Sequence, residues 1–286
     1  MLFVSLFYIM LTISELFIYP IKSLGGIAVS NAYVTDRGLQ YDRRWMLVDD
    51  NNIFLTQREW PAMALFDVAI KDEGLLVTHK PDGAAMLVPF ESQTSEVLTV
   101  EVWSDHCKAI VVSHEANAWF SKLLNMNCKL VYMPDAVKRS VDEKYALDKE
   151  IVSFADGYPM LLIGQSSLDD LNNKLQEKLT MRRFRPSIVF TGGEPFEEDE
   201  LKAFTINGIH FFGVKLCARC VITTINPDTA TKGKEPLRTL ATYRMENNKI
   251  YFGQNLLHKG EGWIQVGDAI EVIKRKAATR YFTQDK

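Results

Sequence analysis

The feature that most constrains the fold is a long series of short apolar segments, rich in β-branched and aromatic residues, that are separated by turn signals. Between residues 65 and 112, for example, such segments alternate with the turn sequences KDEG at 71–74 and PDG at 81–83. Segments of this kind are typical of β-strands, and Gly, Pro and Asp between them favour tight turns. The pattern therefore predicts a mostly β chain.

Helical signals are few. The apolar positions 116, 119, 120, 123 and 124 share one face of a predicted helix. The sequence SLDD at 167–170 predicts the start of a second helix, and EPLRTLATYR at 235–244 suits a short third one. A chain of 286 residues is long enough for two domains. Together these features predict an α+β, predominantly β fold with two barrel-like domains rather than a doubly wound sheet.

The best candidate for a linker is the segment 134–149, which has mixed charges and few apolar residues. It divides the chain into predicted domains at 14–133 and 150–286, preceded by an N-terminal extension of uncertain role at 1–13. Residues 1–13 are almost wholly apolar, but they lack the basic start and cleavage site of a signal peptide. They are also shorter than the ~20 residues of a membrane-spanning helix. We expect an N-terminal strand or a start-site extension, with a membrane anchor through residues 1–19 as the alternative.

The overall charge and the cysteine content limit the protein's environment and partners. A net charge of −3 argues against general binding of nucleic acid. Four cysteines in this length do not form a disulfide framework, so a reducing compartment, the cytoplasm, is expected.

The sequence CARC at 217–220 places Cys217 and Cys220 three positions apart with Arg219 between them. A β-branched run follows, so we expect a strand, a loop that displays a thiol, and a second strand. A neighbouring arginine favours the thiolate, which is the form that attacks or binds a metal. Three other interpretations remain open: half of a zinc site, a redox pair, or two buried apolar cysteines.

Several basic or hydroxyl side chains lie where predicted strands end. Lys22 and Ser23 are on a glycine-bounded loop, and Arg185 precedes a buried-looking strand. Arg43 and Arg44 would face opposite sides of one strand, so one of them is expected to point inward and to need an anion. Solvated loop residues, or pairing of Arg43 with Asp42, would explain the same pattern without a ligand. If the groups converge, a ligand with a phosphate at one end and a soft metal at the other, such as molybdopterin, would use all of them.

The sequence also resembles a known family, the MOSC proteins that carry a MOSC N-terminal β-barrel domain, and among them the mitochondrial amidoxime-reducing components and their bacterial counterparts. The motifs that carry the resemblance are YPIKS at 19–23, DRRW at 42–45, FADGYP at 154–159, FRP at 184–186, CARC at 217–220 with TT at 223–224, and KEPL at 234–237. They occur in register from about residue 14 to residue 272. The resemblance implies an N-terminal β-barrel-like domain and a C-terminal MOSC β-barrel with a few peripheral helices.

The resemblance also implies roles for individual residues. Cys220 would be the protein ligand of molybdenum, with Asp156 beside the metal as a second catalytic residue. The residues implied to bind the molybdopterin cofactor are Lys22, Ser23, Arg43, Gly157, Arg185, Ser187, Ala218, Arg219 and Cys220. Ser187 departs from the asparagine of the relatives, and its side chain has a shorter reach.

The implied function is a molybdenum-dependent oxidoreductase that reduces N-hydroxylated or N-oxide compounds. No flavin or iron–sulfur motif is visible, so electrons would come from a separate protein such as a ferredoxin, a cytochrome b5-like protein or a flavin reductase. The rival function is a sulfur carrier in which a cysteine holds a persulfide and no metal binds. A barrel that binds a ligand without catalysis is the third possibility.

Overall fold

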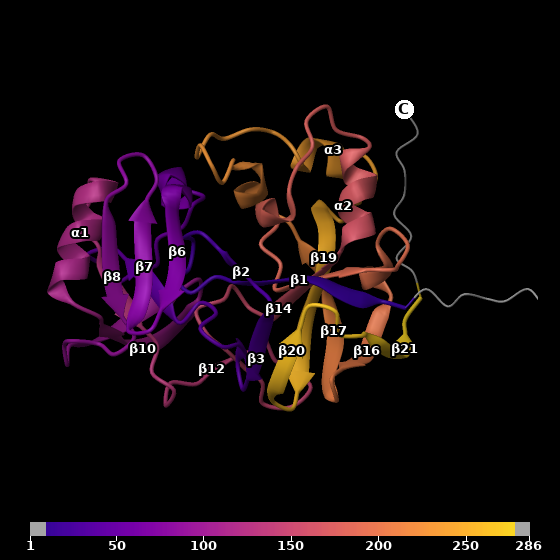
Figure 1. Ribbon diagram of the computed structural model, residues 1–286, viewed down its shortest axis with the longest axis horizontal. Coiled ribbons are helices and arrows are strands. Elements are labelled where there is room, and N and C mark those ends of the chain that lie inside the picture. The colour runs from indigo at the N-terminus through magenta and orange to yellow at the C-terminus, as the bar shows by residue number, and fades with distance from the viewer. Residues whose placement is uncertain (1–9, 278–286) are drawn as a thin grey trace, which may run out of the picture.

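The computed structural model describes residues 10–277 and shows two lobes along the long axis of the molecule (Figure 1). The larger lobe is built on a sheet of nine strands. In order across this sheet the strands are β2 (Ile27–Val29), β1 (Thr12–Ile18), β15 (Ile188–Thr191), β14 (Met160–Gly164), β19 (Lys249–Lys259), β17 (Ile209–Ala218), β16 (Leu201–Ile206) and β21 (Glu271–Arg275), and β18 (Met245–Glu246) pairs with β19. The β14–β15 pair is parallel, and the other pairs of this sheet are antiparallel.

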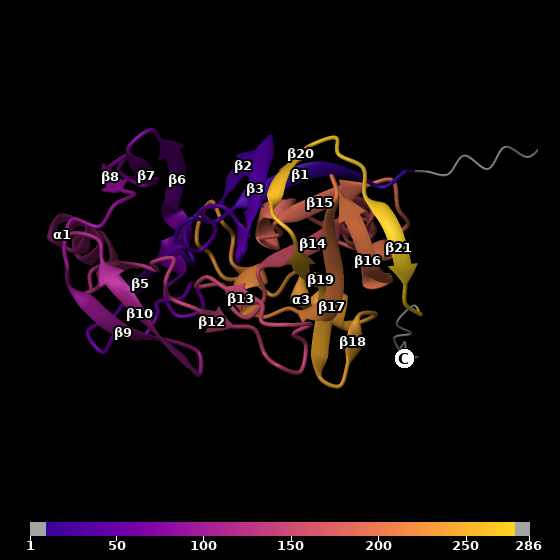
Figure 2. The same ribbon diagram turned by 90° about the horizontal axis from the view of Figure 1, so that it is seen from below.

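The smaller lobe contains two antiparallel sheets and one helix (Figures 1 and 2). One sheet has the order β5 (Trp45–Val48), β11 (Lys129–Tyr132), β10 (Asp105–Val111) and β9 (Val97–Val102). The other has the order β6 (Phe66–Lys71), β7 (Gly74–His79) and β8 (Ala85–Pro89). A buried cluster that includes Trp45, Phe66 and Phe120 packs between these strands and helix α1 (His114–Leu124).

Strands from the beginning of the chain complete the larger lobe. β1 lies between β2 and β15, and β3 (Asn31–Thr35) pairs with both β4 (Gly38–Leu39) and β20 (Gly262–Gln265). Leu16 and Ile18 of β1 belong to one buried cluster, whereas Phe17 belongs to another on the opposite face. A strand buried on both faces is apolar at almost every position. This burial explains the continuous apolar run from Leu16 to Ile18 at the end of β1, whereas Thr12, Ser14 and Glu15 are only partly buried.

The expectation for the N-terminal extension can be tested only for residues 10–13. Residues 1–9 lie outside the described part of the chain, whereas Thr12 and Ile13 begin β1 and pair with Thr191 and Phe190. Within residues 10–277, no helix combines the length and the apolar character needed to cross a membrane. The boundaries at 133 and 150 stay a prediction. The segment between them contains β12 (Arg139–Ser140), which pairs with β13 (Ile151–Val152).

The three described α-helices lie at the periphery, in the three regions where the sequence predicts helices. In α1 the hydroxyl of Ser113 accepts the N–H of Ala116 at 3.0 Å, which satisfies a free donor at the helix start. The short helix α3 (Leu237–Ala241) follows Pro236.

The predicted start of the remaining helix, α2 (Gln165–Asn172), was wrong. Its N-cap is Gly164, and Ser167 lies inside the helix. The Ser167 hydroxyl donates to the buried carboxylate of Glu198 at 2.7 Å, so it cannot cap the helix. The predicted fold class, predominantly β with a few peripheral helices, is confirmed.

Candidate functional site

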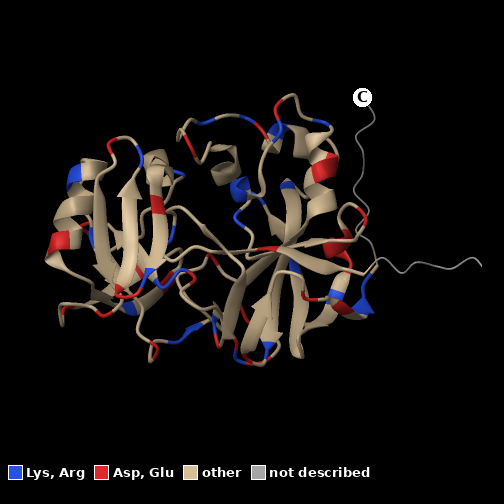
Figure 3. Cartoon of the chain, in the orientation of Figure 1, with Lys and Arg blue, Asp and Glu red and all other residues tan. Residues whose placement is uncertain are grey.

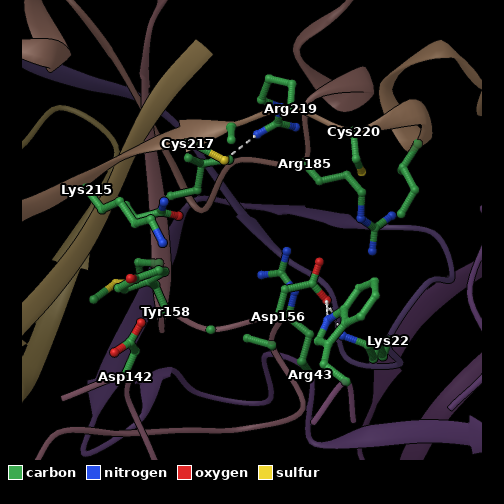
Figure 4. A pocket seen from close by; sticks show the side chains of 18 of the residues that line it. Lys22, Arg43, Asp142, Asp156, Tyr158, Arg185, Lys215, Cys217, Arg219 and Cys220 are labelled. Carbon is green, nitrogen blue, oxygen red and sulfur yellow. Dashed lines mark hydrogen bonds and ion pairs between the residues drawn. The ribbon is translucent and has the colours of Figure 1, made fainter. Parts of the chain in front are cut away.

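A cavity of about 720 Å³ lies where the two lobes meet, and both halves of the chain line it (Figure 4). All predicted site residues except Ser187 are among its lining residues: Lys22, Ser23, Arg43, Asp156, Gly157, Arg185, Ala218, Arg219 and Cys220. Ser187 is fully buried, and its hydroxyl accepts the N–H of Leu161 at 3.3 Å. Sequence reasoning thus identified residues that the fold brings together from positions up to about two hundred residues apart.

Both cysteines of the CARC sequence are free and partly exposed. Cys217 is near the end of β17, and Cys220 lies just before the 3₁₀ helix Val221–Thr224. The expected second strand was wrong, because the backbone N–H and the hydroxyl of Thr223 both donate to the carbonyl of Cys220 and close a tight turn. This turn displays the Cys220 side chain at the cavity. Both thiols being partly exposed argues against the interpretation as two buried apolar cysteines.

The two thiols contact different arginines, of which the sequence pattern indicated only Arg219. Arg219 donates to the Cys217 sulfur at 3.1 Å and to the carbonyl of Phe184 at 2.6 Å. The Cys220 sulfur instead accepts from Arg58, at 3.3 Å. Arg58 comes from the N-terminal half of the chain, and sequence reasoning did not identify it.

Asp156 is the centre of a cluster of polar side chains. Its carboxylate accepts from Lys22 at 2.5 Å, from the Trp103 indole at 3.2 Å, and from Arg58 at 3.4 Å. Although burial alone would favour the neutral acid, the positive charge and hydrogen bond of Lys22 hold the pKa of Asp156 well below its usual range. Asp156 is therefore a carboxylate at any pH near neutrality.

Arg139 holds the loop that carries Asp156 through hydrogen bonds to the backbone of that loop. This buried guanidinium donates to the carbonyls of Ser153 at 3.0 Å and Ala155 at 2.5 Å, and pairs with Asp105 at 2.8 Å. Sequence reasoning assigned Arg139 to the linker, where no local pattern separates it from a solvated arginine. Gly157 follows Asp156, and a Cβ atom at that position would meet no other atom within 4 Å, so space is open above this loop.

A second cluster places two arginines on one tyrosine ring. The guanidinium carbons of Arg43 and Arg185 lie 4.4 Å and 4.2 Å from the centre of the buried Tyr19 ring. Arg43 pairs with Asp42 at 2.6 Å, whereas Arg185 has no carboxylate partner among the described ion pairs and donates only to the carbonyl of Leu24, at 2.7 Å. Burial lowers the pKa of Arg185 to about 10, which leaves it charged at neutral pH.

Three of the predicted site residues have an unusual backbone conformation. Ser23, Arg43 and Arg185 have φ values of 68°, 49° and 55°, in the left-handed region that residues other than glycine rarely occupy. Arg43 therefore lies in a turn before β5 and not on the strand, so the predicted alternation of Arg43 and Arg44 was wrong. Arg43 reaches the cavity because this turn directs it there. Left-handed residues gather at ligand-binding sites, where the fold compensates their strain.

The side chains that line the cavity fit a cofactor that itself supplies most of the ligands of its metal. Within residues 10–277, no group of three or more His, Cys, Asp and Glu side chains could hold a metal, as a protein-ligated zinc site requires. The cavity does offer the thiols of Cys217 and Cys220 beside several partly or fully buried cations, among them Arg185, which has no carboxylate partner among the described ion pairs. Figure 4 shows Cys220, Arg185, Asp156 and Lys22 around one space.

Comparison with known proteins is consistent with this arrangement. The MOSC N-terminal beta barrel domain matches residues 10–127, and the MOSC domain matches residues 149–271. Mitochondrial amidoxime-reducing component 1 of Mus musculus is 31% identical over 279 residues, which cover 92% of this chain and 82% of the relative. The chain belongs to the MOSC family.

Other MOSC relatives widen the range of activities to consider. Mitochondrial amidoxime reducing component 2 of Homo sapiens is 31% identical and covers 91% of this chain and 82% of its own length. Molybdenum cofactor sulfurase of Arabidopsis thaliana is also 31% identical, over 88% of this chain but only 34% of its own length. These relatives confirm the predicted family.

Proposed function

We propose that this MOSC protein is a molybdenum-cofactor-dependent oxidoreductase that reduces N-hydroxylated or N-oxide compounds. The observation that carries the proposal is the presence, in one cavity, of the Cys220 thiol and the partly buried cation Arg185, which has no carboxylate partner among the described ion pairs. A partly desolvated charge that is not paired directly with a carboxylate is unfavourable, and a bound phosphate would reduce that penalty. The amidoxime-reducing relatives supply the reaction class.

In this proposal each part of the cavity has a task. Cys220 would bind the metal, with Ala218, Arg219 and Gly157 beside the cofactor. Lys22, Ser23, Arg43 and Arg185 would hold its phosphate and pterin through charge-assisted hydrogen bonds. Ser187 is too deeply buried to line the cavity, so its predicted contact would require movement of the chain.

The bound cofactor would supply the electron transfer, and the chain would supply the binding and orientation of the substrate. In the net reaction the N–O bond breaks, the substrate gains two electrons and two protons, and the oxygen leaves as water. Because Asp156 is ionised near neutral pH, its carboxylate would accept a hydrogen bond from the substrate hydroxyl rather than donate a proton. Its predicted catalytic role is therefore orientation.

The partners and location remain part of the proposal. The electron donor would be a separate protein, either a ferredoxin, a cytochrome b5-like protein or a flavin reductase, and the substrate a small N-hydroxylated molecule. A cytoplasmic location stays a prediction.

One experiment tests the reaction without knowledge of the donor. The protein is produced in a host that makes the molybdenum cofactor, and its molybdenum content and reduction of benzamidoxime by reduced methyl viologen are measured. About one molybdenum per chain together with benzamidine formation is the expected result. Metal-free protein, or metal-loaded protein that leaves benzamidoxime unchanged, would contradict the proposal.

The sulfur carrier remains the second candidate, because the sulfurase of A. thaliana is among the relatives and both thiols at the cavity are partly exposed. A persulfide on Cys217 or Cys220 would be detected as sulfane sulfur released by cyanide. Sulfane sulfur in protein that lacks molybdenum would favour this second function.

A further inference from the structure

Arg58 joins the two groups that the proposed function places beside the metal. One terminal nitrogen of its guanidinium lies 3.3 Å from the Cys220 sulfur and 3.4 Å from the Asp156 carboxylate. The residue is 162 positions from Cys220 in the sequence and belongs to the other half of the chain. It donates a hydrogen bond to the thiol that the resemblance assigns to the metal, and neither the resemblance nor the sequence patterns gave it a role.

The surroundings of Arg58 hold its side chain in place. Its guanidinium carbon lies 4.4 Å from the centre of the Trp103 ring, and the Trp103 indole in turn donates to Asp156 at 3.2 Å. Trp103 lies at the turn between β9 and β10 with a left-handed φ of 59°, and its ring packs 4.9 Å from Phe54. The Arg58 carbonyl accepts from Lys232 at 3.2 Å, which ties its backbone to the second half of the chain. Both ends of Arg58 are therefore restrained.

We propose that Arg58 is a positioning residue that fixes the Cys220 sulfur by an N–H···S hydrogen bond and tunes the metal through it. The inference rests on the proposed function. A sulfur ligand has lone pairs left after it binds a metal, so it still accepts a hydrogen bond. Donors of this kind withdraw electron density from the sulfur and shift the reduction potential of the metal. Trp103 serves the same end by stacking on Arg58.

This role predicts which property changes when Arg58 is replaced. In Arg58→Met the sulfur loses its donor but keeps its metal, so molybdenum content is retained. The Mo(V) electron paramagnetic resonance spectrum shifts, and the reduction potential becomes more negative. The kcat for benzamidoxime falls by roughly tenfold to hundredfold, the usual effect of removing a partner of a metal ligand, with KM little changed.

Two further variants and a control complete the experiment. Arg58→Lys keeps a cationic donor and is expected to restore much of the native spectrum. Trp103→Leu, at an exposed position, removes the stacking partner and is expected to give a smaller shift in the same direction. Arg44→Met is the matched control, because Arg44 also stacks on an aromatic ring and pairs with a carboxylate but lies outside the cavity.

The possible outcomes separate this inference from the proposed function. If the wild type carries molybdenum and the Arg58→Met spectrum and potential equal those of the wild type, the inference is wrong and the proposed function stands. Loss of molybdenum in both Arg58 variants would also overturn it, since Arg58 would then hold the cofactor itself. Wild-type protein without molybdenum would refute the proposed function first.

Discussion

At the residue scale, the site depends on a few side chains whose partners are distant in the sequence. The basic residues predicted to bind an anion do converge, but local reasoning did not identify every contact. Arg219 was expected to lie beside a thiol of the CARC sequence, and the structure places it against Cys217. The guanidinium next to Cys220 belongs to Arg58, whose own sequence neighbourhood carries no functional signal.

Replacement of Cys220 tests the predicted metal ligand. We expect Cys220→Ser to lose molybdenum and activity while keeping the fold, because a hydroxyl is a poor substitute for a soft thiolate ligand. Molybdenum analysis, the benzamidoxime assay and circular dichroism measure these three properties. Cys217→Ser is the matched control and should retain the metal. Full activity in Cys220→Ser would falsify the ligand assignment.

Replacement of Arg185 tests the anion site. Arg185→Ala removes a partly buried cation that has no carboxylate partner among the described ion pairs, so we expect lower molybdenum content in the purified protein. Loss of a hydrogen bond to a charged group weakens binding by about 2 kcal/mol, which is roughly thirtyfold. Arg182→Ala is the control, since Arg182 is exposed, pairs with Asp228 and does not line the large cavity. Equal metal content in both variants would remove Arg185 from the site.

At the scale of elements, a buried carboxyl group ties the start of α2 to the 3₁₀ helix Glu197–Asp199. Glu198 is fully buried and accepts from Ser167 at 2.7 Å. Burial, together with the charge of Asp199, raises the pKa of Glu198 to about 8. The folded protein therefore binds a proton that the unfolded chain has already released at neutral pH. Stability is present in full below the unfolded pKa of about 4.5 and is lost as the pH rises towards 8.

The loss of stability with rising pH gives a prediction for Glu198→Gln. Glutamine keeps an acceptor for Ser167 and does not ionise, so the variant should be more stable than the wild type at pH 8. Each unit of pKa shift corresponds to about 1.4 kcal/mol, so a gain of roughly 2–4 kcal/mol is expected, decreasing towards pH 5. Urea unfolding at the two pH values measures it. Glu200→Gln, at a partly exposed neighbour, should show no such dependence; a gain in Glu198→Gln that is equal at pH 5 and pH 8 would contradict the prediction.

At the scale of the whole molecule, the two lobes do not correspond to two separate halves of the sequence. β1 pairs with β15, and β3 pairs with β20, so the strands between residues 12 and 39 contribute to the larger lobe. The cavity also takes lining residues from both halves, and Figure 3 shows basic residues in blue on loops between the lobes. Folding of the larger lobe and formation of the site should therefore depend on the N-terminal segment.

A fragment of residues 150–286 tests this dependence. Without β1, the fragment loses Ile13, Leu16 and Ile18, which are almost fully buried in the cluster that contains Ile188 and Phe190. Burial of each such side chain contributes about 2 kcal/mol, so the total loss is comparable to the net stability of a domain. We expect no cooperative unfolding transition in urea. Residues 10–286 serve as the control, and cooperative unfolding of the isolated fragment would show that β1 is dispensable.

The sequence by itself determined the strand-rich fold, the three helical regions and a set of site residues that, apart from Ser187, do line the cavity, but it missed Arg58 and Arg139. These features depend on local periodicity, on turn chemistry and on motifs in which neighbouring residues act together. The tertiary structure alone decided that Arg58 contacts Cys220, that Ser167 serves Glu198 and not a helix cap, and that β1 completes the larger lobe. Such contacts join residues far apart in the chain, and their energy depends on burial and on exact distance, neither of which a local pattern encodes.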